Sequence, residues 1–335
     1  MNQKTVISLS PHIKDSDTTE KIMRRVAIAL LPALIMSVYF FGLRALFVSA
    51  WAVICCAGTE LCIQKLLFKR ASSVHDFSAI VTGMLLAFNL PSNIPLWQVA
   101  VGSLAAIGAA KMTFGGLGKN PFNPALIGRA FMLASFPADM TCWPLPHAVD
   151  GLLNFTRSGF DAETGPTVLA LIKENVKNGA ALDTLRSTLP GYKNLFLGFT
   201  GGSLGEVSGA AVLIGCAYLI FRKVITWHIP FFYLAGLSAL TGLFWISNPQ
   251  IYADPLLHIL SGGALLGACF MATDMVTSPV TVKGQIIFAA AGGILCGAIR
   301  IFGSYPEGCS YSILILNAFV PLIDKFVTPV RYGKN

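Results

Sequence analysis

The chain has 335 residues, of which 54% are hydrophobic and only 12% charged, and its net charge is +8. Soluble domains carry about 25% charged residues, so this composition and a mean hydropathy of +0.67 exclude a large soluble protein. The basic residues gather at the ends of apolar runs instead of forming a stripe with aromatics, which argues against nucleic-acid binding.

Ten apolar stretches are predicted as membrane helices, because most approach the ~20 residues needed to cross ~30 Å of hydrocarbon. They cover residues 25–43, 46–66, 77–91, 96–113 and 123–137, then 207–221, 224–246, 256–273, 285–302 and 309–327. The third, fifth and sixth are short and lie next to breaks rich in Gly and Pro. Short helices beside such breaks are typical of discontinuous helices in transporter-like folds.

The predicted fold is an all-α membrane protein with about ten transmembrane helices. Its expected parts are a cytoplasmic tail (1–24), a five-helix membrane unit (25–137), a long external polar loop (138–205), a second five-helix unit (206–328) and a cytoplasmic tail (329–335). Most Lys and Arg residues then fall on the cytoplasmic side, against only Arg44 and Arg300 in short external connections. This asymmetry predicts that both termini are cytoplasmic.

An internal repeat relates residues 82–131 to residues 261–319. Thr82-Gly-Met-Leu-Leu-Ala87 echoes Gly262-Gly-Ala-Leu-Leu-Gly267, and Arg129-Ala-Phe131 echoes Asn317-Ala-Phe319. A unit of five helices has an odd number of crossings, so its copy would insert upside down. The sequence therefore predicts two inverted repeats with the functional site between them.

The long polar segment contains Asp161-Ala-Glu-Thr-Gly-Pro-Thr167. Read locally, this is a loop before a helix, with Thr164 or Thr167 as N-cap and residues 168–177 as the first turns. The segment also resembles the flavin-attachment motif Asp-x-x-Ser/Thr-Gly-Ala-Thr, in which flavin transferases join FMN through its phosphate to the last Thr. The resemblance makes Thr167 the FMN phosphoryl threonine and places Asp161 and Thr164 at recognition positions. Pro166 departs from the motif, where Ala is usual, and lacks an N–H group.

Other segments extend the resemblance over nearly the whole chain. They resemble the D subunit of Rnf electron transport complexes and the related B subunit of the sodium-pumping NADH:quinone reductase; the shorter N-terminal tail favours the Rnf type. The segments are Gly115–Phe131, Gly202-Ser-Leu-Gly-Glu206, Trp227-His-Ile-Pro230, Phe270-x-x-x-Asp274 with Thr277, and Arg300-x-Phe-Gly-x-Tyr-Pro306.

This resemblance implies a membrane subunit of a complex that moves electrons between ferredoxin and NAD, coupled to Na⁺ or H⁺ transport. It implies covalent FMN, a noncovalent riboflavin, partner subunits of Rnf types A, B, C, E and G, and a flavin transferase for maturation. It also implies the inner membrane of a prokaryote, and a chain that is not a complete enzyme alone. The quinone-reductase subunit and a non-redox membrane transporter stay open as alternatives.

Asn120 and Asn123 lie in a Gly-rich loop and are each followed by Pro. This loop is either a re-entrant turn or the riboflavin pocket, in which the two amides would pair with the ring edge.

The acids Glu60, Glu206 and Asp274 fall in or beside apolar runs, where a charge must face protein or water. Glu206 and Asp274 are candidates for ion or flavin contact. The alternatives are that Glu60 pairs with Lys65, that Glu206 marks a helix start and that Asp274 lies at a membrane edge. The eight cysteines include no C-x-x-C pair, so no metal site is expected.

Overall fold

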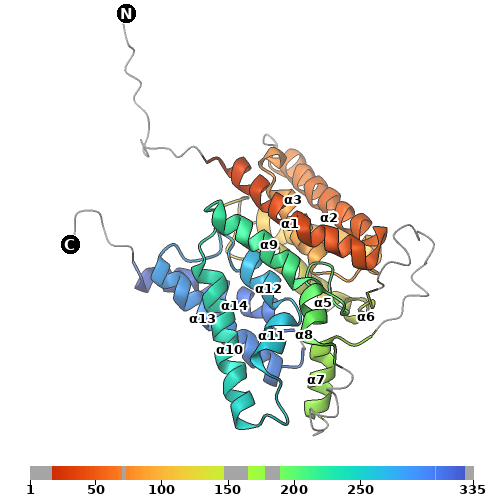
Figure 1. Ribbon diagram of the computed structural model, residues 1–335. Coiled ribbons are helices and arrows are strands. Elements are labelled where there is room, and N and C mark those ends of the chain that lie inside the picture. Colours follow the sequence, from red (N-terminus) through yellow and green to blue (C-terminus); the bar gives the residue numbers. More distant parts are fainter. Residues whose placement is uncertain (1–16, 70–72, 147–164, 178–188, 306, 329–335) are drawn as a thin grey trace, which may run out of the picture.

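The computed structural model describes residues 17–69, 73–146, 165–177, 189–305 and 307–328, and these residues form an all-α protein (Figure 1). The fold class predicted from the sequence is therefore confirmed. The helices of the first half are α1 (Thr19–Phe41), α2 (Leu43–Cys62) with the π-helical turn η1 (Ile63–Leu67), the 3₁₀ turn η2 (Val74–Asp76), α3 (Ser78–Phe88), α4 (Leu96–Leu104) with π-helical η3 (Ala105–Met112), and α5 (Pro124–Ser135).

Among the described residues, three short helices lie between the two halves of the chain. The connecting helices are α6 (Pro137–Thr141), α7 (Val168–Lys177) and α8 (Tyr192–Leu197). The second half contains α9 (Gly209–Phe221), α10 (His228–Ser247), α11 (Pro255–Leu260), α12 (Ala264–Leu266) with π-helical η5 (Gly267–Met271), α13 (Val282–Phe302) and α14 (Cys309–Phe326).

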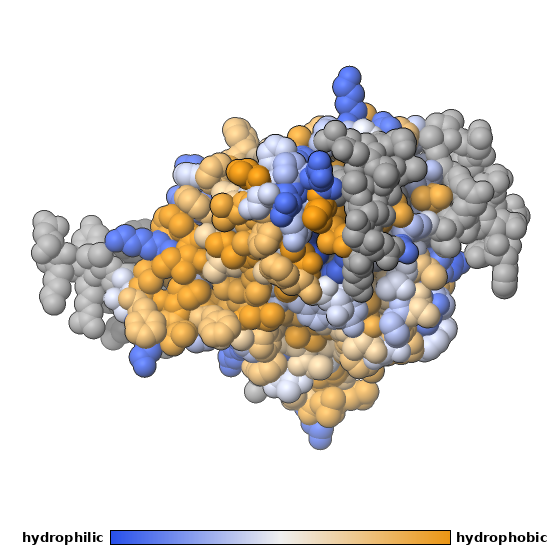
Figure 2. All heavy atoms as spheres, turned by 90° about the horizontal axis from the view of Figure 1, so that it is seen from below, coloured by the Kyte–Doolittle hydropathy of each residue, from blue (hydrophilic) through white to orange (hydrophobic). Residues whose placement is uncertain are grey.

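Among the described residues, five helices are long and apolar enough to cross a membrane: α1, α2 with η1, α10, α13 and α14. Four shorter apolar helices, α3, α4 with η3, α5 and α9, match further predicted spans. Hydrophobic residues cover broad areas of the face seen in Figure 2, as expected of a surface that meets lipid. The number of crossings and the domain boundaries stay predictions.

The prediction of one continuous helix over residues 256–273 is wrong. Residues 256–273 form α11, then a break at Ser261–Gly263, then α12 with η5. Gly262 has φ of +66°, a conformation that side chains with a Cβ atom rarely adopt. The break therefore turns the chain inside the protein, where helical periodicity alone predicts continuity.

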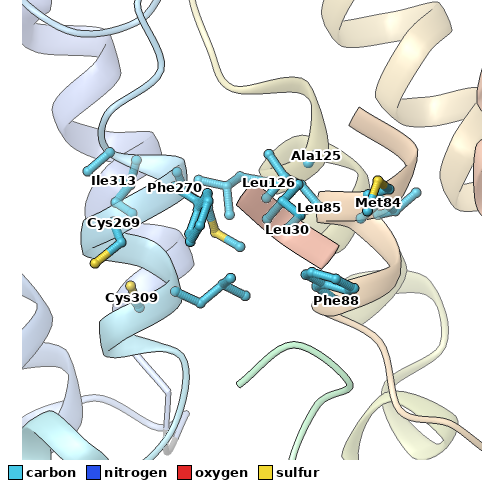
Figure 3. Packing of buried hydrophobic residues seen from close by; sticks show 14 of the residues in the cluster. Leu30, Met84, Leu85, Phe88, Ala125, Leu126, Cys269, Phe270, Cys309 and Ile313 are labelled. Carbon is cyan, nitrogen blue, oxygen red and sulfur yellow. The ribbon is translucent and has the colours of Figure 1, made fainter. Parts of the chain in front are cut away.

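The two halves share one hydrophobic core. In Figure 3, Phe270 from the second half faces Leu85, Phe88 and Leu126 from the first. Ten of the eleven residues of α3 are buried, so this helix lies inside the protein rather than against lipid. Helix α1 packs on α9, and α5 on α14. A two-fold axis that relates two five-helix units would pair these helices in this way.

Gly292-Gly293 allows α10 and α13 to pack closely. A Cβ atom at position 293 would lie 2.0 Å from the carbonyl oxygen of Tyr233, so α10 and α13 can approach only because the residue is Gly. The pair Gly262-Gly263 makes room for side chains instead of a neighbouring helix. There the missing Cβ atoms leave room for the carboxylates of Glu307 and Glu206.

A buried ion pair fixes η3 to α2 and α3. The Nζ atom of Lys111 lies 2.7 Å from Oε2 of Glu60 and 2.6 Å from the hydroxyl of Ser78. The other oxygen of Glu60 accepts hydrogen bonds from Gln64 and Ser73. The side chains of Glu60 and Lys111 are 0% and 1% exposed.

The expected pairing of Glu60 with Lys65 is therefore wrong. Lys65 is exposed, whereas Lys111 comes from a distant helix that sequence spacing could not identify.

We predict that Lys111→Met destabilises the protein by about 3–5 kcal/mol, because it leaves an unpaired carboxylate buried. The double variant Glu60→Gln/Lys111→Met should recover much of this loss, because neither charge then remains. Thermal unfolding of the purified chain in detergent measures both. Lys65→Met is the matched control and should change stability by less than about 0.5 kcal/mol. Additive losses in the double variant would contradict the pairing.

Candidate functional site

Two pockets lie at the two ends of α5. Asn123, the N-cap of α5, lines one pocket, and Arg129 and Leu133 of the same helix line the other. Arg129 follows Asn123 by six positions, which corresponds to about 9 Å along a helix axis. We name these cavities the Asn120 pocket and the Thr167 pocket, after the candidate residues that they contain.

The Thr167 pocket contains the predicted FMN attachment residue. Thr167 is the N-cap of α7, and its hydroxyl oxygen accepts a hydrogen bond of 3.2 Å from the N–H of Ala170. The predicted helix start at this residue is confirmed. The free N–H groups of a helix N-terminus also suit a phosphate. A phosphate ester on Thr167 would therefore lie where backbone donors already point.

The segment before Thr167 is anchored to the pocket wall. The N–H of Gly165 donates to the carbonyl of Trp143 at 3.1 Å, and Trp143 lines the pocket. Pro166, which lies between Gly165 and Thr167 in the chain, is exposed. Asp161 and Thr164, the predicted recognition residues, lie outside the described residues.

Aromatic rings and charges form the rest of the Thr167 pocket, which holds about 530 Å³ of space free of protein atoms, including its open mouth. The rings of Tyr305 and Tyr311 stack with centroids 5.7 Å apart. Lys173 of α7 donates to the carbonyl of Tyr305 at 2.6 Å, which ties α7 to this wall. Flat aromatic surfaces beside a guanidinium suit a planar, electron-accepting ring.

Arg129 is the charged residue at the centre of this site. It donates through Nη1 to the side-chain oxygen of Asn89 at 2.7 Å and through Nη2 to Glu307, with which it forms a salt bridge. Arg129 is 6% exposed, so both bonds lie inside the protein. Because Glu307 follows α13 and Arg129 belongs to α5, this pair joins the two halves of the chain at the pocket.

The Asn120 pocket is larger and mostly apolar, with about 750 Å³ of space free of protein atoms, including its open mouth. This size is within the usual range for a small-molecule site. Asn120 is 3% exposed and donates through its amide nitrogen to the carbonyl of Phe122, while its amide oxygen has no hydrogen-bond partner. A buried acceptor without a partner fits a ligand that brings an N–H group.

Asn123 differs from Asn120, although the sequence pattern pairs them. Its amide oxygen accepts from the N–H of Ala125 at 3.0 Å, and its amide nitrogen donates to the carbonyl of Met271 at 3.2 Å. Asn123 therefore caps α5 and holds it to η5. The Gly-rich loop reaches Asn120 through Gly115, Gly116 and Gly118, whose φ angles are all positive.

The two candidate acids lie at different pockets. Asp274 lines the Asn120 pocket and accepts bonds from the N–H of Val276 and the hydroxyl of Thr277, each 3.3 Å long. Glu206 lies beside Gly263, next to the residues of the Thr167 pocket. The alternative that Glu206 starts a helix is wrong, because Ser208 is the N-cap of α9.

A short hydrogen-bonded route connects the pockets. Asn89 accepts from Arg129 of the Thr167 pocket and donates to the carbonyl of Leu85 at 2.6 Å. Leu85 lines the Asn120 pocket. The hydrogen bonds of Asn89 thus link a residue that lines the Thr167 pocket to a residue that lines the Asn120 pocket.

Sequence reasoning missed Glu307 and the positions of Arg129 and Lys111 in the two sites. The sequence did contain one signal for the Arg129 site. A lone Arg inside an apolar run needs a buried partner. Within the described part of the chain, no group of three or more His, Cys, Asp or Glu side chains is placed to hold a metal ion.

Comparison with known proteins gives full-length relatives. The model of the NQR2, RnfD, RnfE family matches residues 6–333. The D subunit of the Na(+)-translocating ferredoxin:NAD(+) oxidoreductase complex of Acetobacterium woodii is 46% identical over 98% of this chain and 95% of its own. The D subunit of the proton-translocating ferredoxin:NAD(+) oxidoreductase complex of Clostridium ljungdahlii is 43% identical over 98% of this chain and 96% of its own.

A more distant relative is the D subunit of the ion-translocating oxidoreductase complex of Salmonella paratyphi B. It is 37% identical over 98% of both chains. All three alignments cover 98% of this chain, so the similarity extends over nearly the whole membrane fold. The chain belongs to the NQR2, RnfD, RnfE family.

Proposed function

We propose that this chain is the flavin-carrying D subunit of an ion-translocating ferredoxin:NAD oxidoreductase complex in a prokaryotic inner membrane. The observation that carries the proposal is the pair of pockets at opposite ends of α5, one of which contains the hydroxyl of Thr167. Relatives that match nearly the whole chain carry the name of this subunit. The expected partners are the A, B, C, E and G subunits.

The Thr167 pocket would hold FMN through a phosphate ester on Thr167, formed by a flavin transferase. Helix α7 offers its N-terminal amides to the phosphate, and Arg129 lies beside the ring site. The Asn120 pocket would hold riboflavin, with the free oxygen of Asn120 as acceptor for a ring N–H. Bound flavin supplies the redox chemistry, and the protein sets its spacing, its electrostatic surroundings and the access of water.

The arrangement of the pockets supports opposite sides of the membrane for the two flavins. The Asn120 pocket includes Ile22 and Met23 from the first turns of α1, next to the N-terminal tail that the positive-inside rule assigns to the cytoplasm. The Thr167 pocket includes Met140, Thr141 and Trp143, which follow α5. Thr167 would then face outward.

Two alternatives remain as outcomes of the experiments. The B subunit of the sodium-pumping quinone reductase belongs to the same family, and the other proteins that copurify with the chain distinguish it. A non-redox transporter would lack covalent flavin.

We predict that Thr167→Val abolishes flavin fluorescence of the denatured protein band, because no hydroxyl remains to form the ester. The chain is expressed with its flavin transferase and compared by fluorescence and by mass spectrometry of the peptide around residue 167. Thr141→Val, in the same pocket but exposed, is the matched control and should keep full fluorescence. A wild-type chain without attached flavin would favour the transporter.

We predict that Asn120→Leu weakens noncovalent flavin binding about tenfold to a hundredfold, because a lost hydrogen bond to a buried group costs ~1–3 kcal/mol. Acid extraction of the folded protein, followed by flavin quantification, measures the loss. The covalent flavin on Thr167 should stay unchanged, and Lys119→Met in the same loop should retain riboflavin. If Asn120→Leu releases as much riboflavin as the wild type, this pocket is not the riboflavin site.

We predict that a membrane-impermeant thiol reagent labels Cys142 from the outside of intact cells. Cys142 is exposed beside the Thr167 pocket. Cys62 is the other exposed cysteine, so it is replaced by Ser in this experiment. In a Lys119→Cys variant that lacks Cys142, labelling should require inverted membrane vesicles. The reverse pattern would place the Thr167 pocket in the cytoplasm.

A further inference from the structure

A cluster of four charged side chains surrounds Gly262 and Gly263, behind the Thr167 pocket. The cluster consists of Glu206 before α9, Glu307 before α14, Arg129 of α5 and Arg300 of α13. Arg129 and Arg300 are 6% and 4% exposed, so the cluster is inside the protein. The chain break at Gly262, with its positive φ, makes the room for it.

Three of the four carboxylate oxygens in this cluster have a hydrogen-bond donor. Glu307 accepts from the N–H of Gly263 at 2.8 Å and from Arg129. Glu206 accepts through Oε1 from the N–H of Ser203 at 3.1 Å. Oε2 of Glu206 is buried and has no partner. A charged oxygen without a donor in this position is costly.

The free oxygen of Glu206 points toward the other charges. A Cβ atom placed on Gly263 would lie 3.2 Å from Oε2 of Glu206, 3.8 Å from Oε1 of Glu307 and 3.9 Å from Nη1 of Arg129. All three atoms therefore lie around the position that one methyl group at residue 263 would occupy. Two carboxylates that share such a site do not both ionise readily.

Neither arginine of the cluster donates a hydrogen bond to the free oxygen of Glu206. Arg129 donates to Asn89 and Glu307. Arg300 donates to the carbonyls of His258 and Ser261. A carboxyl group that carries its own proton is a donor as well as an acceptor, and it needs no such partner.

We propose that Glu206 is a proton-binding site beside the Thr167 pocket. We also propose that proton binding at Glu206 and the arrival of negative charge in that pocket stabilise each other. The first part stands on the geometry above, and the second rests on the proposed function. With Glu206 neutral, Arg129, Arg300 and Glu307 leave the cluster with one net positive charge. This charge stabilises an electron that the complex delivers to the adjacent pocket.

Charge balance follows from this linkage. The electron comes from the preceding redox carrier of the complex. At a pH where Glu206 is ionised before the electron arrives, the proton comes from water and binds Oε2 of Glu206; at lower pH the proton is already bound. When the electron leaves for the next carrier, the affinity of Glu206 for the proton falls by the same factor. No bond other than the O–H bond forms or breaks in this step.

The geometry favours a proton over a metal ion. Only one carboxylate oxygen is free, and the guanidinium of Arg129 faces the same space. In the described ranges, no third acid, His or Cys joins Glu206 and Glu307 in a metal-binding group. A sodium ion is the competing occupant, and the experiment separates it from a proton.

The first measurement is infrared spectroscopy of the full chain at neutral pH. We expect a carbonyl band of a protonated carboxylic acid that shifts in D₂O and is lost in Glu206→Gln. Glu174→Gln, at an exposed carboxylate of α7, is the matched control and should keep the band. The band should persist in Thr167→Val, because the proton site does not require covalent flavin.

A band that is unchanged in Glu206→Gln, or absent from the wild type, would overturn the proposal. So would a band that disappears when Na⁺ is added at constant pH, since that result indicates a cation site. If Glu206→Gln does not fold, Glu206→Asp decides instead, because a moved carboxylic acid must shift the band.

The second measurement is the midpoint potential of the covalent flavin in the intact complex as a function of pH. Above the pH at which the infrared band of the oxidised protein disappears, reduction must bring a proton to Glu206. In that range Glu206→Gln should lose up to one proton per electron of the wild-type dependence, which corresponds to about 59 mV per tenfold change in proton concentration. Glu174→Gln should follow the wild type. Identical slopes in wild type and Glu206→Gln would overturn the linkage. Absence of covalent flavin would refute the proposed function, while the infrared result would still decide the proton site.

Discussion

A guanidinium inside a membrane protein requires a partner, and Arg129 finds its partner in the other half of the chain. Its salt bridge with Glu307 joins α5 to the segment between α13 and α14, and its bond to Asn89 reaches α3. Removing one member would leave a buried charge alone, which is far more costly than losing an exposed pair. The two halves must therefore assemble in one relative position. Because Arg129 also lines the Thr167 pocket, the interaction that fixes the fold also places positive charge at the candidate redox site.

The shortness of α5 gives the molecule its two pockets. Its 12 residues extend about 18 Å, well below the ~30 Å of a hydrocarbon layer. A helix of this length cannot reach both surfaces of the layer, so at least one of its ends would lie within it, where irregular backbone must be covered by protein or line a cavity. The Gly-rich loop fills one end and the Met140–Trp143 segment the other. Longer helices such as α1 and α10 then cover the assembly against lipid.

Most of the helices and the start of α7 at Thr167 could be predicted from the sequence, because apolar length and N-cap residues are local signals. The break at Gly262 could not, since the next residue, Gly263, donates its N–H to the carboxylate of Glu307, which is 44 residues further along the chain. The partner of Glu60 escaped prediction for the same reason: Lys65 is near in sequence, whereas Lys111 is near in space. The motif around Asn120 and Asn123 was found, but only the structure separates the capping amide from the one with a free oxygen.

The relatives limit what the overall fold can determine about the coupling ion. One relative is named for a sodium-translocating complex and another for a proton-translocating complex, and they match this chain at 46% and 43% identity, each over 98% of its length. The same backbone therefore serves complexes named for different ions, and ion choice must depend on a small number of side chains or on other subunits. A proton on Glu206 that compensates charge beside the pocket is compatible with either ion, because its task is local electrostatic balance. Glu206 and the transported ion are therefore separable questions, and the structure addresses the first through the atoms around Gly263.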